Sequence, residues 1–203
     1  MFWVFVFGCF LGVIIEVIWA FVMYGKMESR QGLVYGPFNL VYGFGALIFT
    51  MVLVKLDLKS GLGIIIVGSI MGGIFEYACS VIQEFVTGSV SWDYSDFYFN
   101  INGRINLVYC IFWGLLAFGW YKFLFPRFSD LIEKIPNKIG VIGTWIVLAF
   151  FVFNTVVSAL AVYRTCLRQN HIPPANAFEE FLDRRFTDER MHEIYPNMSF
   201  VEK

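Results

Sequence analysis

The chain has 203 residues, of which 58% are hydrophobic, 20% aromatic and only 15% charged, and its formal net charge is −1. Soluble domains carry roughly a quarter of charged residues, so this composition indicates a protein embedded in a lipid bilayer. The near-zero net charge, without any Lys/Arg-rich run, excludes an electrostatic surface for nucleic acid.

Five apolar stretches have about the length of a membrane-spanning helix, which needs roughly 20 residues to cross the hydrocarbon core. The first has no basic segment before it and is longer than the apolar core of a signal peptide, so we predict a first span and not a cleaved leader. The sequence therefore predicts an all-α integral membrane protein with about five transmembrane helices. These helices are expected at residues 2–24, 38–54, 62–86, 105–125 and 139–163.

A repeated pattern groups the first four spans into two hairpins. The first span has glycine, glycine and glutamate at intervals of four residues, and the third span has the same pattern 60 residues later. The second and fourth spans both begin with Asn-Leu-Val-Tyr, 67 residues apart. Because each unit holds two spans, the sequence predicts parallel repeats at about 1–56 and 61–125, related by a twofold axis along the membrane normal. The fifth helix, at about 139–163, has no counterpart.

Glu16 and Glu76 end the two glycine patterns and are the first candidates for chemistry. A carboxylate within a span costs about 3 kcal/mol on insertion scales, so it normally faces a bundle interior, a water cavity or a partner. Residues four apart share a helix face. We therefore expect Gly12 and Gly72 to lie where the first and third helices cross, and the two carboxylates to meet near the axis. A substrate- or proton-binding role and a structural hydrogen-bond clamp both remain open.

Charged residues in the hairpin loops form a second candidate group. Arg30 and Arg104 lie on the same side of the membrane, where each can pair bidentately with a carboxylate or bind an anionic head group. We expect at least one of them to pair with Glu76, Glu84 or Asp93. This cluster would then close the mouths of the two hairpins.

Residues 164–203 form a soluble amphipathic tail, whereas residues 1–163 form the transmembrane domain. Two prolines end the fifth helix, and Asn176 followed by Glu179 resembles a capping box. The apolar side chains that follow at helical spacing predict a helix that lies on the membrane face or on the protein's own loops, and a solvated appendage is the alternative. Lys26 and Arg30 follow the first span and no charged side chain precedes it, which favours an outside N-terminus and a cytoplasmic tail.

Several loop motifs together resemble the ABC-transporter type IV membrane family (CmpB-like), over the first four helices. Gly36-Pro37 and Asn102-Gly103 suit turns, and Trp92 suits the head-group level. Leu40 departs from the family pattern, which has a proline there. The motifs are Arg30-Gln31-Gly32-Leu33, Gly36-Pro37-Phe38, Tyr42-Gly43-Phe44-Gly45-Ala46, Trp92-Asp93-Tyr94-Ser95 and Asn102-Gly103-Arg104-Ile105.

The resemblance implies a permease in a bacterial plasma membrane. The chain has no Gly-x4-Gly-Lys-Ser/Thr phosphate loop, so a transporter would need a separate ATPase subunit, and five short spans would need a homodimer or a membrane partner. No cofactor and no metal site is expected. Two other functions remain open. One is a scaffold or regulator without catalytic activity, and the other is an enzyme acting on lipid head groups, with Glu76 or Asp93 as base and Arg30 and Arg104 as an anion clamp. An enzyme is disfavoured because no nucleophile–base pair is evident.

Overall fold

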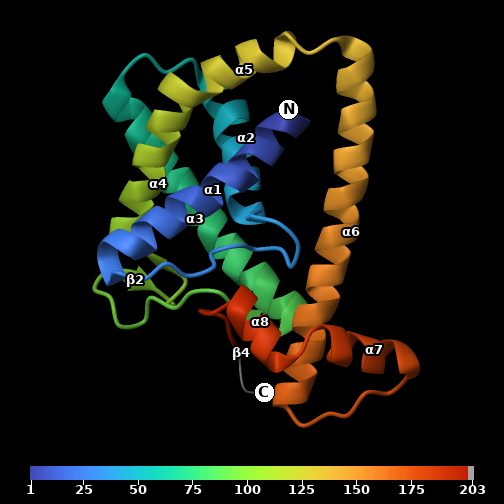
Figure 1. Cartoon of the computed structure of the whole chain (residues 1–203). Coiled ribbons are helices and arrows are strands. Elements are labelled where there is room, and N and C mark those ends of the chain that lie inside the picture. The colour runs from blue at the N-terminus through green and yellow to red at the C-terminus, as the bar shows by residue number, and fades with distance from the viewer. Residues whose placement is uncertain (201–203) are drawn as a thin grey trace.

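A computed structural model describes residues 1–200, which are mostly helical (Figure 1). Four helical segments are long and apolar enough to cross a membrane, so the chain is a multi-pass integral membrane protein. These segments are α1 (Phe2–Tyr24), α3 (Gly61–Thr87), α6 (Asn137–Gln169) and the run Leu107–Glu133, which joins α4 (Leu107–Gly119), η1 (Trp120–Leu124) and α5 (Phe125–Glu133). Against the five predicted spans, α2 (Leu40–Leu56) is apolar but has only 17 residues.

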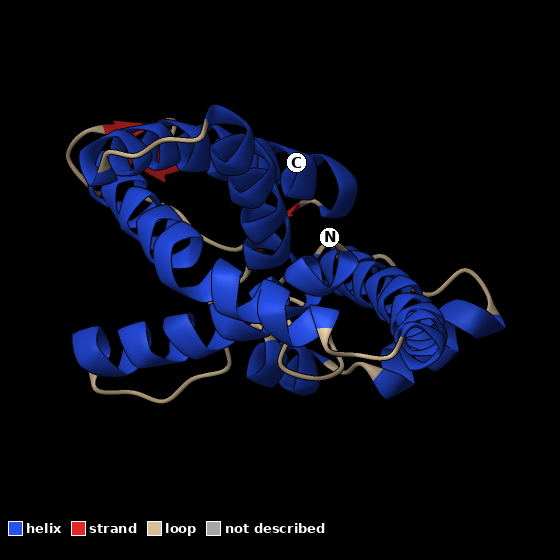
Figure 2. Ribbon diagram, turned by 90° about the horizontal axis from the view of Figure 1, so that it is seen from above, coloured by secondary structure: helices blue, strands red, loops and turns tan. Residues whose placement is uncertain are grey.

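The smaller elements lie in the loops and the tail. Figure 2 shows the molecule from above, with the strands as short segments among the helices. The tail contains α7 (Ala177–Arg185) and α8 (Asp188–Ile194). The strands form two antiparallel pairs, β1 (Ser89–Val90) with β4 (Ser199–Phe200), and β2 (Asn100–Ile101) with β3 (Ile105–Asn106).

The fourth span extends beyond residue 125, where the sequence analysis ended it. The π-helical turn η1 joins α4 to α5, and Pro126 follows at the start of α5. Proline lacks the backbone N–H that a continuous α-helix would use, and a change of helix type is one way to continue the chain past it. The helix therefore turns over the top of the bundle (Figure 1).

The glycines of α1 and α3 face the second helix of their own hairpin. A Cβ atom on Gly12 would lie 2.2 Å from Cβ of Tyr42, and one on Gly72 would lie 2.3 Å from Cβ of Trp113. The expectation that Gly12 and Gly72 mark a crossing of α1 with α3 is therefore wrong. A small-residue face lets any neighbouring backbone approach, and helices joined by a short connection are the usual neighbours.

The contacts in the two hairpins occur at matching positions, but the register changes along the second helix. Asn39 and Asn106, 67 residues apart, each accept a hydrogen bond from the N–H two residues on and begin α2 and α4. Tyr42 and Trp113, which contact the equivalent glycines, are 71 residues apart. The chain thus has about one more helical turn between the cap and the crossing in α4 than in α2.

The tail packs against the end of α6 and the loop between α1 and α2. Leu182, Phe186 and Met191 are buried in a cluster with Val34 and Ala161. This arrangement agrees with a tail that lies on the protein's own loops, and not with a solvated appendage. Helix α6 continues past residue 163 to Gln169, so the tail begins further along the chain than the composition indicated.

Candidate functional site

Glu76 is a nearly fully buried carboxylate on α3, with 6% of its surface exposed. Its two oxygens have different donors. The Tyr94 hydroxyl donates to Oε1 at 2.8 Å, and the Trp113 indole N–H donates to Oε2 at 3.0 Å. Tyr94 comes from the loop between α3 and α4, and Trp113 from α4, so the second hairpin and its loop together position Glu76.

Glu16 occupies the corresponding place in the first hairpin. The Tyr42 hydroxyl donates to its Oε1 at 2.7 Å. The rings of Tyr42 and Trp113 are neighbours, with centroids 5.3 Å apart. The two carboxylates are therefore linked through this ring pair. The sequence predicts that they meet near the axis, and in the structure each is hydrogen-bonded to aromatic side chains and not to the other carboxylate. We call Glu16, Tyr42, Glu76, Tyr94 and Trp113 the acidic aromatic cluster.

No ion pair involves either carboxylate of the cluster within residues 1–200. Their partners are hydroxyl and indole groups, which donate a hydrogen bond but carry no positive charge. Burial and the Glu76 carboxylate raise the pKa of the Tyr94 hydroxyl, so this hydroxyl stays protonated as a donor at neutral pH. The cluster is thus acidic and has no compensating cation of its own.

The predicted ion pair at the mouth of the second hairpin is present, between Arg104 and Glu84. The Arg104 guanidinium also donates to Ser80 Oγ at 3.0 Å and lies 6.0 Å from the centre of the Tyr77 ring. Arg104 therefore pairs with Glu84 and not with Glu76. Hydrogen bonds from Ser95 hold the pKa of the exposed Asp93 carboxyl below its usual value, and Asp93 caps a local turn.

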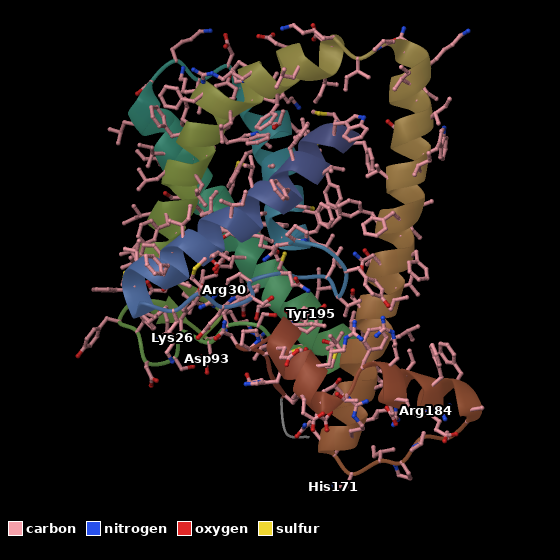
Figure 3. All side chains as sticks on the ribbon, viewed as in Figure 1. Lys26, Arg30, Asp93, His171, Arg184 and Tyr195 are labelled. Carbon is pink, nitrogen blue, oxygen red and sulfur yellow. The ribbon has the colours of Figure 1, made fainter. Side chains whose placement is uncertain are left out.

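Arg30 forms no ion pair with Glu16 or Glu76. Its guanidinium contacts Glu28 at 3.4 Å, and its Nε atom is buried with no hydrogen-bond partner. Figure 3 shows Lys26, Arg30 and Asp93 at the loop end of the helices. These charges surround the loop end but do not join the acidic aromatic cluster.

The other motif residues build the loops. Gly36 and Gly103 have positive φ angles of 74° and 67°, which favour glycine, and Asn102 has a φ of 53°. Pro37 follows Gly36 in an exposed turn. The Trp92 indole N–H donates to the Arg104 carbonyl at 3.0 Å, so Trp92 braces the loop as well as suiting the membrane interface.

Sequence reasoning found the glutamates but missed the aromatic donors. Tyr42 belongs to the repeated Asn-Leu-Val-Tyr motif, which was a usable signal. Its sequence counterpart, Tyr109, does not contact Glu76 but stacks on Tyr94, with centroids 4.6 Å apart. The residue of α4 that donates to Glu76 is Trp113, four residues after Tyr109. The motif offset of 67 residues therefore predicts the wrong residue of α4.

The described part of the chain contains no cluster of side chains that could bind a metal ion. No three His, Cys, Asp or Glu side chains lie close enough together there to hold a metal ion. The polar groups that do come together are carboxylates, phenols and indoles, which suit a proton or a soft organic cation.

A family model described as "Putative ABC-transporter type IV" matches residues 3–159. The chain belongs to this family. The match runs from α1 through most of α6 and leaves α7 and α8 outside, and it confirms the resemblance seen in the loop motifs. No curated protein and no solved structure matches the chain. Family membership and the apolar helices together describe a transporter-like multi-pass membrane protein.

Proposed function

We propose that this chain is the permease-like membrane subunit of a transporter, and that the acidic aromatic cluster binds a substrate or a proton between the two hairpins. One observation carries the proposal. Two carboxylates lie inside membrane helices and are linked through the neighbouring rings of Tyr42 and Trp113. No arginine, lysine or histidine of residues 1–200 forms an ion pair with either carboxylate. Intramembrane carboxylates are rare and often mark a substrate or proton pathway, and a carboxylate without a cationic partner is free to take up a proton or a cation.

The arrangement of the hairpins supports the same function. We treat them as two parallel repeats with α2 as the fifth crossing, since α2 returns the chain to the side where α3 begins (Figure 1). Glu16 and Glu76 then lie on equivalent helices on either side of the repeat axis. Transporters built from repeats place their sites at the repeat interface, near the middle of the bilayer.

Partners and orientation follow from the family and the sequence. The family description favours a separate ATPase subunit, and a small number of spans favours a second copy or a membrane partner. Lys26 and Arg30, which follow the first span, favour an outside N-terminus, with α7 and α8 in the cytoplasm of a bacterium.

The test compares Glu76→Gln and Glu16→Gln with the wild-type protein in liposomes. Glutamine keeps the shape: its oxygen can accept the hydrogen bond from the Trp113 indole, and its amide group can donate to the Tyr94 hydroxyl oxygen. It cannot titrate or carry charge. We expect both variants to stay folded and monodisperse, and to reduce gradient-driven uptake of protons or small organic cations to the level of empty vesicles.

Glu133→Gln, at an exposed position on α5, is the matched control and should leave uptake unchanged. A Glu76→Gln variant that transports as well as the wild-type protein would contradict the proposal. In that case the cluster would be only a structural clamp.

A further inference from the structure

A small apolar cavity lies between the two hairpins, beside the acidic aromatic cluster. Its volume is about 140 Å³. Helix α1 contributes Gly8 and Gly12 to its wall, and the other helices contribute mainly aromatic and aliphatic side chains. Those other lining residues include Tyr42 and Phe49 of α2, Trp113 and Leu115 of α4, and Trp120 of η1.

The cavity exists because α1 and α4 each pack on their own hairpin partner. The main contacts between the hairpins are made by α2, with α3 and with η1, so the middle of α1 does not close against α4. Aromatic pairs connect α1 to the second hairpin on either side of the α1 residues that line the cavity. Trp19 meets Phe112 toward the loops, with centroids 4.7 Å apart, and Phe7 stacks on Phe128 toward the other end at 4.5 Å.

The open side of the cavity faces the lipid. Leu115 lines it and is 48% exposed, and this exposed surface belongs to a helix that spans the membrane. A molecule in the hydrocarbon layer could therefore enter sideways between the two aromatic pairs.

The back wall of the cavity supplies the recognition chemistry. Tyr42 and Trp113 line the cavity, and their hydroxyl and indole groups hydrogen-bond to the Glu16 and Glu76 carboxylates, which therefore lie one side chain away from it. Aromatic faces attract cations, and the attraction is strongest where water is excluded. The adjacent carboxylates carry no compensating cation, so a positive head group would complement both features.

The size of the cavity limits the apolar part of the ligand. An apolar cavity of roughly 150 Å³ in another protein stays dry and accepts benzene. A guest of about that size fits here. A neutral lipid chain of that size would also fit, but it would make no electrostatic interaction with the Glu16 and Glu76 carboxylates.

We propose that this cavity is a lateral binding site for lipophilic cations, that is, ammonium compounds with an apolar group of about the size of benzene that enter from the bilayer. The inference rests on the proposed function and specifies its substrate class. Three probes separate the contributions. Benzyltrimethylammonium carries both features, tetramethylammonium has only the charge, and neopentylbenzene is the uncharged isostere of the first.

The experiment measures equilibrium binding of tritiated benzyltrimethylammonium to the purified full chain in nanodiscs, with empty nanodiscs subtracted and the other two compounds as competitors. We expect benzyltrimethylammonium to bind at least tenfold more tightly than either competitor. Leu115→Trp, which fills the cavity from its exposed side, should weaken binding at least tenfold. Ile111→Trp, one turn away on the same helix and 47% exposed, is the matched control and should bind like wild type.

The outcomes distinguish this inference from the proposed function. Equal binding of neopentylbenzene would mean that charge is not recognised, and equal binding of tetramethylammonium would mean that the apolar cavity is not used. Either result, or a Leu115→Trp variant that binds like wild type while remaining monodisperse, overturns the inference. None of these results touches the liposome assay with Glu76→Gln, so the proposed function stands or falls separately. Glu16→Gln and Glu76→Gln should reduce the preference for the cation over its neutral isostere.

Discussion

At the scale of single residues, the absence of a side chain at Gly72 controls the geometry around Glu76. Gly72 lets α3 approach α4 so closely that a Cβ atom there would lie 2.3 Å from Cβ of Trp113. Trp113 in turn donates the indole hydrogen bond to Glu76. The glycine therefore places the donor as well as the helix, and replacing it should disturb both packing and the cluster.

We predict that Gly72→Ala destabilises the protein by about 1–3 kcal/mol, the usual range for overpacking a tightly packed contact. Gly119, on the same hairpin, has nothing within 4 Å of where its Cβ would be. Gly119→Ala should therefore be neutral or stabilise the helix by up to about 1 kcal/mol. Thermal unfolding of the two variants in detergent gives the comparison, and equal midpoints would argue against a close crossing at Gly72.

The sequence revealed the glutamates and glycines because their spacing repeats, but it could not reveal which side chains they meet. Glycine faces are compatible with many partners, and only the three-dimensional packing selects Tyr42 for Gly12 and Trp113 for Gly72. The ion pair of Arg104 was predictable because charge in a membrane loop has few alternatives, although the choice of Glu84 over Glu76 was not.

At the scale of elements, helix prediction succeeded where hydropathy alone decides. The bounds of α1 are those predicted, and α3 differs by one residue at each end. Prediction ended α6 too early, because Arg164 and Arg168 interrupt its apolar pattern. In the structure these arginines pair with Asp183 of α7, a partner distant in sequence, and the helix continues to Gln169.

Helix α6 is connected to the first hairpin by a reciprocal pair of hydrogen bonds. The fully buried Asn154 side chain accepts from the Tyr35 N–H at 3.2 Å and donates to the Tyr35 carbonyl at 2.7 Å. Asn154→Leu would leave both backbone groups without a partner, each at about 1–3 kcal/mol. We predict lower thermal stability and faster hydrogen exchange in residues 32–39.

The neighbouring Thr155 is exposed on the same helix, so Thr155→Leu makes the matched change from polar to apolar without removing these hydrogen bonds. It should leave exchange in the loop unchanged. If both variants exchanged alike, the loop would be held by its other contacts, such as the hydrogen bond from Val34 N–H to Ser158 Oγ, and not by Asn154.

At the scale of the whole molecule, the tail joins parts that are distant in the chain. Arg164, with only 2% of its side chain exposed, makes a two-pronged pair with Asp183 at 2.9 and 2.6 Å, and a further contact with Glu179. Strand β4 pairs with β1 in the loop of the second hairpin, and the Ser29 hydroxyl donates to the Ile194 carbonyl. The tail therefore holds α6 and the loops of both hairpins together.

Removing one member of this buried pair should release the tail. Asp183→Asn removes the charge of the residue that pairs with both Arg164 and Arg168, and loss of one partner from a largely buried ion pair is destabilising. We predict faster tryptic cleavage at Arg184 and Arg185 in this variant. Glu180→Gln, an exposed change on the same helix, should leave the cleavage rate as in wild type, and equal rates in the two variants would mean that apolar packing alone docks the tail.

Docking of the tail should also depend on pH, with a sign fixed by Asp183. Hydrogen bonds from Arg164, and then from Arg168, hold the pKa of the docked Asp183 carboxyl below its ordinary value, which is about 3.9 in an unfolded chain. A lowered pKa stabilises docking fully above the ordinary value, and this stabilisation is lost as the pH falls through that value toward the lowered one. Glu179 and Asp188 contact the same arginines, and guanidinium groups stay charged over this pH range. We therefore predict that hydrogen exchange in residues 177–194, corrected for its intrinsic pH dependence, is slow near neutral pH and accelerates below about pH 4. The Asp183→Asn variant should exchange faster at neutral pH and respond less to acid, and an equal response in both proteins would exclude Asp183 as the group that titrates.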